Sequence, residues 1–320
     1  MRSSPFPPLP RVGLIALFSI TLLSSAALSR PSGRGAKPLG EQSDSSAYRA
    51  APTGPRLRIC TGNRNGYYFQ AGQQIAEVAS GNLDINVLET RGSWENLSRA
   101  GAEQRSCDAL IAQEDAYRLY LKENPSIRLE IEAIISLYPE QIHVLCNRAV
   151  DAERLSELEP GRHRLLTARY GSGTYITWTF FKHMAPRYRA LQILEEDSAN
   201  AFSALVSGTS AQCMLSVGAL ARGVVAQAND DYGDQLKLLE IDDPEFLKAV
   251  GRPGEQRQLY QQSYIHKNSY PRLQDRHLSG YQVRAILFLS NEWRTTHSWE
   301  AESLIQTLER ERERFRRSID

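Results

Sequence analysis

The feature that most constrains the fold is a regular alternation of short apolar runs with helix-like segments, which begins at Arg56. Strand, turn and helix patterns at this spacing are typical of a parallel α/β sheet. The first three strand patterns cover 57–61, 85–90 and 108–112, and the helix patterns between and after them cover 67–80, 94–104 and 116–122. Ligands bind beyond the carboxyl ends of the strands in such sheets. We therefore expect the loops 62–67, 91–96 and 113–115 to line a site.

A second series of strands and helices follows the polar segment 151–161. Its strand patterns cover 165–168, 191–194, 212–217 and 236–241, and its helix patterns cover 176–183, 199–207 and 218–228. Two further strands, 131–137 and 142–145, precede it; a helix at 245–250, an apolar run at 283–289 and a charged helix at 299–319 follow it. The sequence thus predicts two α/β lobes, with lobe I formed by 56–146 and 238–320 and lobe II by 147–237.

A glycine loop, Tyr170-Gly171-Ser172-Gly173-Thr174, connects the first strand and helix of the second series. Gly171 and Gly173 permit a sharp turn and close approach of the backbone to a ligand. The free N–H groups and the dipole of a helix N-terminus favour an anion there. The alternative is that Ser172 or Thr174 simply caps the helix.

The N-terminal segment predicts export. Arg2 and Arg11 precede the apolar run 12–28, and small residues follow it, so residues 1–29 resemble a secretory signal peptide. A membrane anchor is the alternative, although the run is short for spanning a bilayer. Residues 30–55, rich in Pro, Gly, Ser and Ala, are expected to form a flexible leader.

Composition and cysteine spacing exclude several classes of function. The formal net charge of the 320 residues is only +1, so no overall field indicates a nucleic-acid partner. The four cysteines are too widely spaced for a zinc ribbon or a CxxC motif. Because each lies in or beside an apolar run, we expect them to be buried free thiols. They are Cys60, Cys107, Cys146 and Cys213. Their pairing cannot be predicted. No metal motif or cofactor motif is present.

An ordered set of short motifs resembles the solute-binding proteins of the TAXI class of TRAP transporters, which have the type II periplasmic binding protein fold. The motifs lie at 61–68, 92–97, 108–115, 136–144 and 171–174. The resemblance implies that a small organic solute, a carboxylate or an amino acid, binds between the lobes and is delivered to a membrane permease. By position it also implies the lining residues, which are Tyr67, Tyr68, Ser93, Asn96, Gln113, Asp115, Gly171, Ser172, Gly173 and Thr174.

Two arginines could supply positive charge to such a site. Arg64 and Arg169 adjoin strand-end loops, where a guanidinium can grip a carboxylate with two hydrogen bonds; the alternative is that they face solvent. Asn63, Arg64 and Asn65 stand where the family usually has glycines, so the identity of the solute does not carry over.

Two other functions compete with solute transport. The altered first loop leaves open a periplasmic sensor or adaptor that partners a membrane protein. An exported hydrolase with Ser172 as nucleophile is disfavoured, because the loop is not Gly-x-Ser-x-Gly and no histidine is well placed as its base. We therefore expect a non-enzymatic binding protein.

Overall fold

A computed structural model describes residues 54–102, 105–196, 198–251, 256–313 and 315 of the protein. The predicted signal peptide and nearly all of the predicted leader lie outside these residues. Within the described part, every helix is too short or too polar to span a lipid bilayer.

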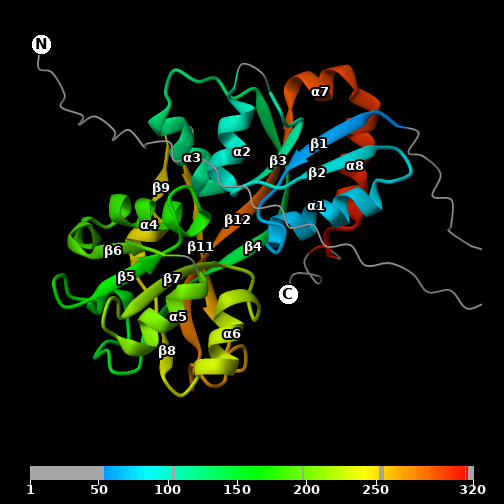
Figure 1. The fold of residues 1–320 in the computed structure, drawn as a ribbon. Helices are drawn as coiled ribbons and strands as arrows, with labels where there is room; N and C mark the ends of the chain where they lie inside the picture. Colours follow the sequence, from blue (N-terminus) through cyan, green and yellow to red (C-terminus); the bar gives the residue numbers. More distant parts are fainter. Residues whose placement is uncertain (1–53, 103–104, 197, 252–255, 314, 316–320) are drawn as a thin grey trace, which may run out of the picture. The chain divides into compact units, whose positions relative to one another are not determined.

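The first strand-and-helix series has the predicted order. Its elements are β1 (Arg56–Cys60), α1 (Tyr67–Val78), β2 (Asp84–Leu88), α2 (Ser93–Ala100), β3 (Ala109–Gln113) and α3 (Glu114–Glu123). β1 pairs in parallel with both β2 and β3, as predicted. Ile75 of α1 packs with Leu57 and Ile59 of β1 in a buried core. The parallel arrangement places the carboxyl ends of β1 and β3 at the same edge as the N-termini of α1 and α2 (Figure 1).

The second series is also α/β. Its elements are η1 (Leu155–Glu157), β5 (Arg164–Thr167), α4 (Gly173–Met184), η2 (Pro186–Ala190), β6 (Gln192–Glu195), α5 (Ser198–Ser207), β7 (Cys213–Gly218), α6 (Gly223–Tyr232) and β8 (Leu236–Leu239). β5 is parallel to β6 and β7. The helix predicted from 218 begins only at Gly223, because Ala221 has a positive φ angle of 58°, which is incompatible with a right-handed helix.

Two long strands, β4 (Ile131–Asn147) and β12 (Leu278–Ser290), join the two series. The prediction of two separate strands at 131–137 and 142–145 was wrong, because β4 continues through Pro139. Proline lacks an N–H and is usually confined to edges and bulges. Here Pro139 lies beside a register shift, in which Ala285 pairs with Tyr138 and Ile286 pairs with Ser136.

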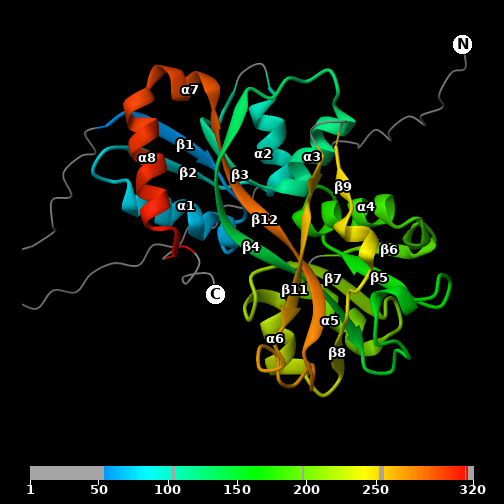
Figure 2. The ribbon, with the colours of Figure 1, turned by 180° about the vertical axis from the view of Figure 1, so that it is seen from behind.

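The sheet is mixed rather than parallel throughout. Its order is β2-β1-β3-β12-β4-β7-β5-β6, and β12 is antiparallel to β3 and β4 while β4 is antiparallel to β7 and β8. We call β1–β3 with α1–α3 the first lobe and β5–β8 with α4–α6 the second lobe. Both ribbon views show β4 and β12 running diagonally from one lobe to the other (Figures 1 and 2).

The last part of the described chain completes both lobes. Its elements are η3 (Pro244–Leu247), β9 (Ala249–Val250), β10 (Arg257–Gln258), β11 (Tyr260–Ile265), α7 (Asn291–Thr296) and α8 (Ser298–Arg310). The helix predicted at 245–250 is a 3-10 turn followed by a short strand, and β11 was not predicted. Ile265, Tyr270 and Leu278 pack in the core of the second lobe. The lobe boundaries remain a prediction, and this packing favours a return to the first lobe along β12 rather than at 238.

The cysteines form two disulfides, Cys60–Cys107 and Cys146–Cys213, so the expectation of free thiols was wrong. Cys146 and Cys213 are register partners on β4 and β7. Cys60 ends β1, and Cys107 precedes the neighbouring β3. The two cysteines of each pair are separated by 47 and 67 positions in the sequence, respectively. Strand pairing makes them neighbours, which their spacing in the sequence does not reveal.

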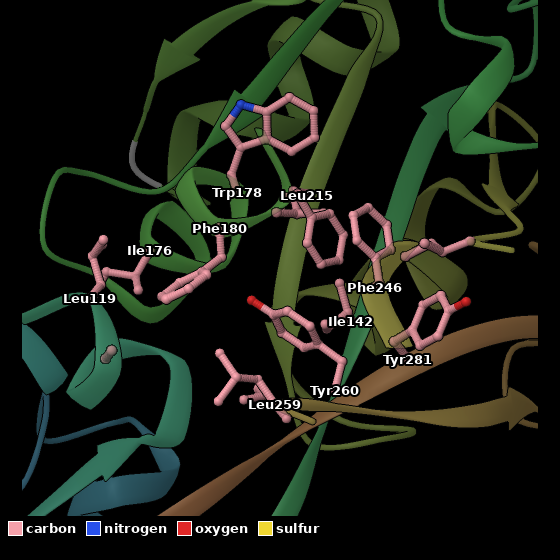
Figure 3. Close-up of a cluster of buried hydrophobic side chains, with 14 of the residues drawn as sticks. Leu119, Ile142, Ile176, Trp178, Phe180, Leu215, Phe246, Leu259, Tyr260 and Tyr281 are labelled. Carbon is pink, nitrogen blue, oxygen red and sulfur yellow. The ribbon is translucent and has the colours of Figure 1, made fainter. Parts of the chain in front are cut away.

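A hydrophobic core continues across the two lobes on the side of α3 and α4. Figure 3 shows side chains from both lobes and from the long strands converging there; they include Leu119, Ile142, Ile176, Trp178, Phe180, Leu215, Phe246, Leu259, Tyr260 and Tyr281. Trp178, Phe246 and Tyr260 are fully buried. This core holds α4, and with it the glycine loop, against the strand ends of the first lobe.

Candidate functional site

Five buried polar residues meet where the strand ends of the first lobe face the second lobe. They are Tyr68, Ser93, Gln113, Tyr138 and Glu140, which we call the Glu140 cluster. The Tyr68 hydroxyl donates to Glu140 Oε2 at 3.1 Å and lies 3.4 Å from Ser93 Oγ. Ser93 Oγ accepts the backbone N–H of Gln113 at 3.1 Å, and the Gln113 side chain hydrogen-bonds Glu140. Three residues predicted to line the site are therefore brought together.

Local backbone geometry explains this convergence. Gln113 is the last residue of β3, and Tyr68 and Ser93 lie in the first turns of α1 and α2. Gly92, with φ of +108°, allows the turn that directs Ser93 inward, since such a φ favours glycine. Tyr138 and Glu140 are two residues apart on β4 and so share one face of the sheet.

Glu140 and Tyr138 were missed by the sequence prediction, because the segment 138–141 was read as a break between strands. The only available signal was an acidic residue inside an otherwise apolar stretch, flanked by patterns typical of strands. A carboxylate in such a position is rarely buried without a specific partner. This signal could have added Glu140 to the candidate residues.

Burial controls the ionisation of the cluster. Loss of hydration raises the pKa of Glu140 from 4.5 to about 7, although hydrogen bonds from Gln113 and Tyr68 oppose the rise. The nearby charge of Asp115 adds to the increase in that pKa. Burial, together with the Glu140 charge, also raises the pKa of Tyr68 and of Tyr138 well above the ordinary value, so both keep their hydroxyl protons at neutral pH.

Two atoms of the cluster are left without a hydrogen bond to any described residue. They are Gln113 Oε1 and the Tyr138 hydroxyl, and both side chains are only 2% exposed. Buried polar groups are nearly always paired in native proteins, so each such exception calls for a specific explanation. Unpaired atoms beside a buried carboxylate are suited to a polar ligand.

The glycine loop of the second lobe lies directly against this cluster. A Cβ atom on Gly173 would approach Cδ of Gln113 to 2.7 Å, closer than real Cβ contacts. Gly171, with φ of +81°, faces Trp94 of the first lobe, where a Cβ would lie 3.3 Å from the Trp94 Cβ. Only glycine at these two positions permits the observed approach of the lobes.

The hydroxyls of the loop serve local structure. Ser172 Oγ accepts the N–H of Tyr175 at 3.2 Å, so Ser172 is the N-cap of α4. Thr174 Oγ1 accepts the N–H of Val217 at 3.2 Å and fixes the loop to the end of β7. This geometry favours the capping alternative for Ser172 and gives no support to a nucleophilic role.

Tyr67 contacts the second lobe at another point. Its half-buried ring lies near Gly218 and Gly223, and its hydroxyl would be 3.2 Å from a Cβ on Gly223. Burial raises the pKa of Tyr67, while the positive charge of Arg222 opposes that change. Tyr67 thus contacts the second lobe, and its role as a lining residue stays a prediction.

Asp115 and Asn96 are both buried, and their hydrogen bonds go to the protein itself. Asp115 accepts from the Thr177 hydroxyl at 2.7 Å, from the Tyr260 hydroxyl at 2.9 Å and from the Ala116 N–H at 2.7 Å. It therefore links α3 to α4 and β11. The pKa of Asp115 is raised from 3.8 to about 6, chiefly by burial.

Asn96 connects three segments of the first lobe. Its Nδ2 donates to the carbonyls of Thr61 and Ile111 at 2.6 and 2.8 Å, and its Oδ1 accepts from the Thr90 hydroxyl at 2.7 Å. Both Nδ2 and Oδ1 are thus hydrogen-bonded within the protein, and the role of Asn96 is to hold the strand ends in place.

Both predicted arginines are exposed. Arg64 has a side chain that is 73% exposed; it pairs with Glu89 at 3.5 Å and lies 5.6 Å from the ring centre of Phe69. Arg169 is also exposed, and its backbone carbonyl accepts the N–H of Ser172 at 3.1 Å. The charge buried where the lobes meet is acidic, not basic.

The structure also contains surface cavities beside α7. One of about 490 Å³ is lined in part by Glu132 and Arg294, and one of about 500 Å³ is lined in part by Arg58 and Trp293. Neither is lined by a residue of the Glu140 cluster. Within the described ranges, no group of three or more His, Cys, Asp or Glu side chains is arranged to hold a metal ion.

Comparison with known proteins gives a family and a set of similar folds. The sequence matches the NMT1-like family over residues 59–293. No curated protein sequence is similar enough to count as a match.

Three solved structures illustrate the similar folds. Lactococcal OpuAC in complex with glycine betaine aligns with 7% identity and a TM-score of 0.49, covering 79% of this chain and 84% of that one. The "probable amino-acid ABC transporter extracellular-binding protein ytmK" of Bacillus subtilis has 12% identity, a TM-score of 0.47 and coverage of 82% and 96%. The alkanesulfonate-binding protein SsuA of Xanthomonas axonopodis pv. citri, bound to MOPS, has 15% identity, a TM-score of 0.46 and coverage of 83% and 78%. Such low identities assign no ligand to this chain.

Proposed function

The chain belongs to the NMT1-like family, and on this premise we propose that it is a periplasmic solute-binding protein that holds a small organic solute between its two lobes. The observation that carries the proposal is the pair of unpartnered buried atoms, Gln113 Oε1 and the Tyr138 hydroxyl, beside Glu140. They lie where strand ends of an α/β sheet face a second lobe, a usual place for a small-molecule site.

The motion expected of such a protein is closure of the lobes around the solute. β4 and β12 are the described strands that pass between the lobes, and the shared core fixes one side of the interface. Opening would therefore separate Gly171 and Gly173 from Trp94 and Gln113. Those contacts would re-form, or be replaced by solute, on closure.

We further propose that the protein is exported by its N-terminal segment and delivers the solute to a TRAP-type membrane permease. This part of the proposal rests on the resemblance of the motifs at 61–68, 92–97, 108–115, 136–144 and 171–174 to the TAXI class. Capture of the ligand-loaded protein by the permease, but not by an unrelated membrane protein, would test it.

The solute-binding proposal is tested by a thermal-shift screen of the purified protein against amino acids, amines, dicarboxylates and keto acids. A compound that binds the native state raises the melting temperature. Calorimetric titration then compares the wild type with Gln113→Ala, for which we expect at least about a tenfold loss of affinity. Gln73→Ala, on the exposed face of α1, is the matched control and should bind as the wild type does.

Two results would contradict the proposal. One is a folded protein whose melting temperature responds to no compound of the screen. The other is a bound compound whose affinity is unchanged in Gln113→Ala, since this would place its site away from the cluster.

A further inference from the structure

We infer that the solute is anchored through a protonated amine, which Glu140, Gln113 and Tyr138 bind together. The inference rests on the proposed function and specifies the chemical class of its ligand. It depends on how the buried acids of this protein are paired, on the two unpartnered atoms and on the position of the arginines.

Four carboxylates are buried in the described structure: Glu114, Asp115, Glu140 and Asp243. Glu114 forms an ion pair with Arg284 at 2.6 Å, and Asp243 forms one with Arg187. Asp115 accepts three hydrogen bonds from the protein. Glu140 differs from the others, because within the described residues it has neither a cationic partner nor a full set of donors.

The neighbours of Glu140 supply acceptors rather than further donors. Its described donors are the Tyr68 hydroxyl and the Gln113 amide. Gln113 Oε1 lies against Gly173 of the glycine loop and remains unpaired. The oxygen of Tyr138 is also unpaired. The acidic Asp115 also contributes a like charge nearby.

An ammonium group matches this arrangement. It has three N–H donors and no acceptor, which equals the number of groups here that lack a donor: the Glu140 carboxylate, Gln113 Oε1 and the Tyr138 oxygen. Its charge would also compensate the buried carboxylate, which is costly without a partner. A solute carboxylate at the same point would instead meet acceptor atoms and two like charges.

The other cationic and anionic ligands fit less well. A calcium ion takes six to eight oxygen ligands, usually including several carboxylates, whereas the cluster contains one. An anionic group would need a cation. Arg64 and Arg169, which were expected to provide it, are exposed, and Arg222, whose charge acts on Tyr67, is exposed as well. The amine is thus the class that satisfies the unpaired atoms and the charge together.

The test uses pairs of compounds that differ only in the amine. The probes are the L-amino acids, n-butylamine and 1,4-diaminobutane, each beside its N-acetylated form, with succinate and 2-oxoglutarate as anions without an amine. We expect an amine to raise the melting temperature and its N-acetylated form to have no effect. In Glu140→Gln, affinity for that amine should fall at least about tenfold, because a hydrogen bond to a charged group is lost.

Glu89→Gln is the matched control, since it removes a carboxylate from an exposed position that follows β2 in the first lobe. It should bind the amine as the wild type does. A purely structural role for Glu140 would lower the melting temperature of unliganded Glu140→Gln, whereas an amine-binding role predicts loss of affinity without such a decrease.

The outcomes separate this inference from the proposed function. If succinate or 2-oxoglutarate binds, amines do not, and Glu140→Gln binds as the wild type does, the solute-binding function stands and the amine inference is overturned. Equal affinity for an amine and its N-acetylated form also overturns it. If nothing in the series binds to folded protein, the proposed function fails and the inference fails with it.

Discussion

Replacing Glu140 by glutamine should stabilise the unliganded protein above neutral pH. Burial raises the pKa of Glu140 from 4.5 to about 7. At about 1.36 kcal/mol per pKa unit, the ionised carboxylate costs the native state roughly 3 kcal/mol. Glutamine keeps an acceptor for Tyr68 and can donate to the unpaired Gln113 Oε1, while it carries no charge that burial penalises.

The sign of the pH dependence follows from proton binding. Between pH 4.5 and about 7 the native state holds a proton on Glu140 that the unfolded state releases. The free energy of unfolding of the wild type therefore falls as the pH rises through this range. Glu140→Gln lacks this decrease, so its advantage should be near zero at pH 4.5 and should reach up to about 3 kcal/mol at pH 8.

Urea denaturation followed by tryptophan fluorescence, at several pH values between 4.5 and 8, measures the difference. Asp115, whose pKa is raised to about 6, contributes a similar pH dependence to both proteins and largely cancels. Glu89→Gln, at an exposed site, should show no pH-dependent increase in the free energy of unfolding relative to the wild type. The reasoning would be refuted if Glu140→Gln were less stable than the wild type at pH 8. It would also be refuted if the substitution increased the free energy of unfolding equally at pH 4.5 and pH 8.

Two further changes probe the contact between the lobes and the covalent links. Gly173→Ala should weaken solute affinity roughly tenfold or more. The added Cβ would lie 2.7 Å from Cδ of Gln113, so either the two lobes must separate or the Gln113 amide must move. Titration calorimetry measures the loss of affinity. Removal of the Cys60–Cys107 disulfide by a double serine substitution should lower the free energy of unfolding by about 4 kcal/mol, since it closes a loop of 47 residues; urea denaturation measures the change.

Each of these changes has a control. Gly81→Ala adds a Cβ into open space and should leave affinity unchanged. Adding a reductant to the wild type should reproduce the lower stability of the double serine variant and have a smaller effect on that variant. Unaltered affinity in Gly173→Ala, or unaltered stability after loss of the disulfide, would contradict the corresponding prediction.

Local periodicity was sufficient to locate most of the helices and strands. The positions of α1, α2, β1 and β3 were predicted to within a few residues, because alternation of apolar residues and the intervening turns are properties of short stretches. The same reasoning placed Ser93 and Gln113 in strand-end loops on one edge, while Tyr68 was implied by the resemblance to the TAXI class. Their convergence follows from parallel pairing alone, which is why it was predictable.

The loop residues show the limit of this reasoning. Arg64 and Arg169 also adjoin strand ends, yet their side chains are exposed. A position in a loop determines where the Cα lies, but the direction of a long side chain depends on its neighbours, such as the Glu89 carboxylate and the Phe69 ring beside Arg64.

The sequence by itself determined the α/β class, the order of the two series of elements and the edge at which the strand-end residues gather. Only the tertiary structure decided the mixed sheet, the two disulfides and the position of Glu140. These depend on pairing between segments far apart in the chain, as when Glu140 pairs with Val283 and Cys146 with Cys213. Pairing of distant strands places a carboxylate among partners that no local pattern contains, and the chemistry of the site follows from those partners.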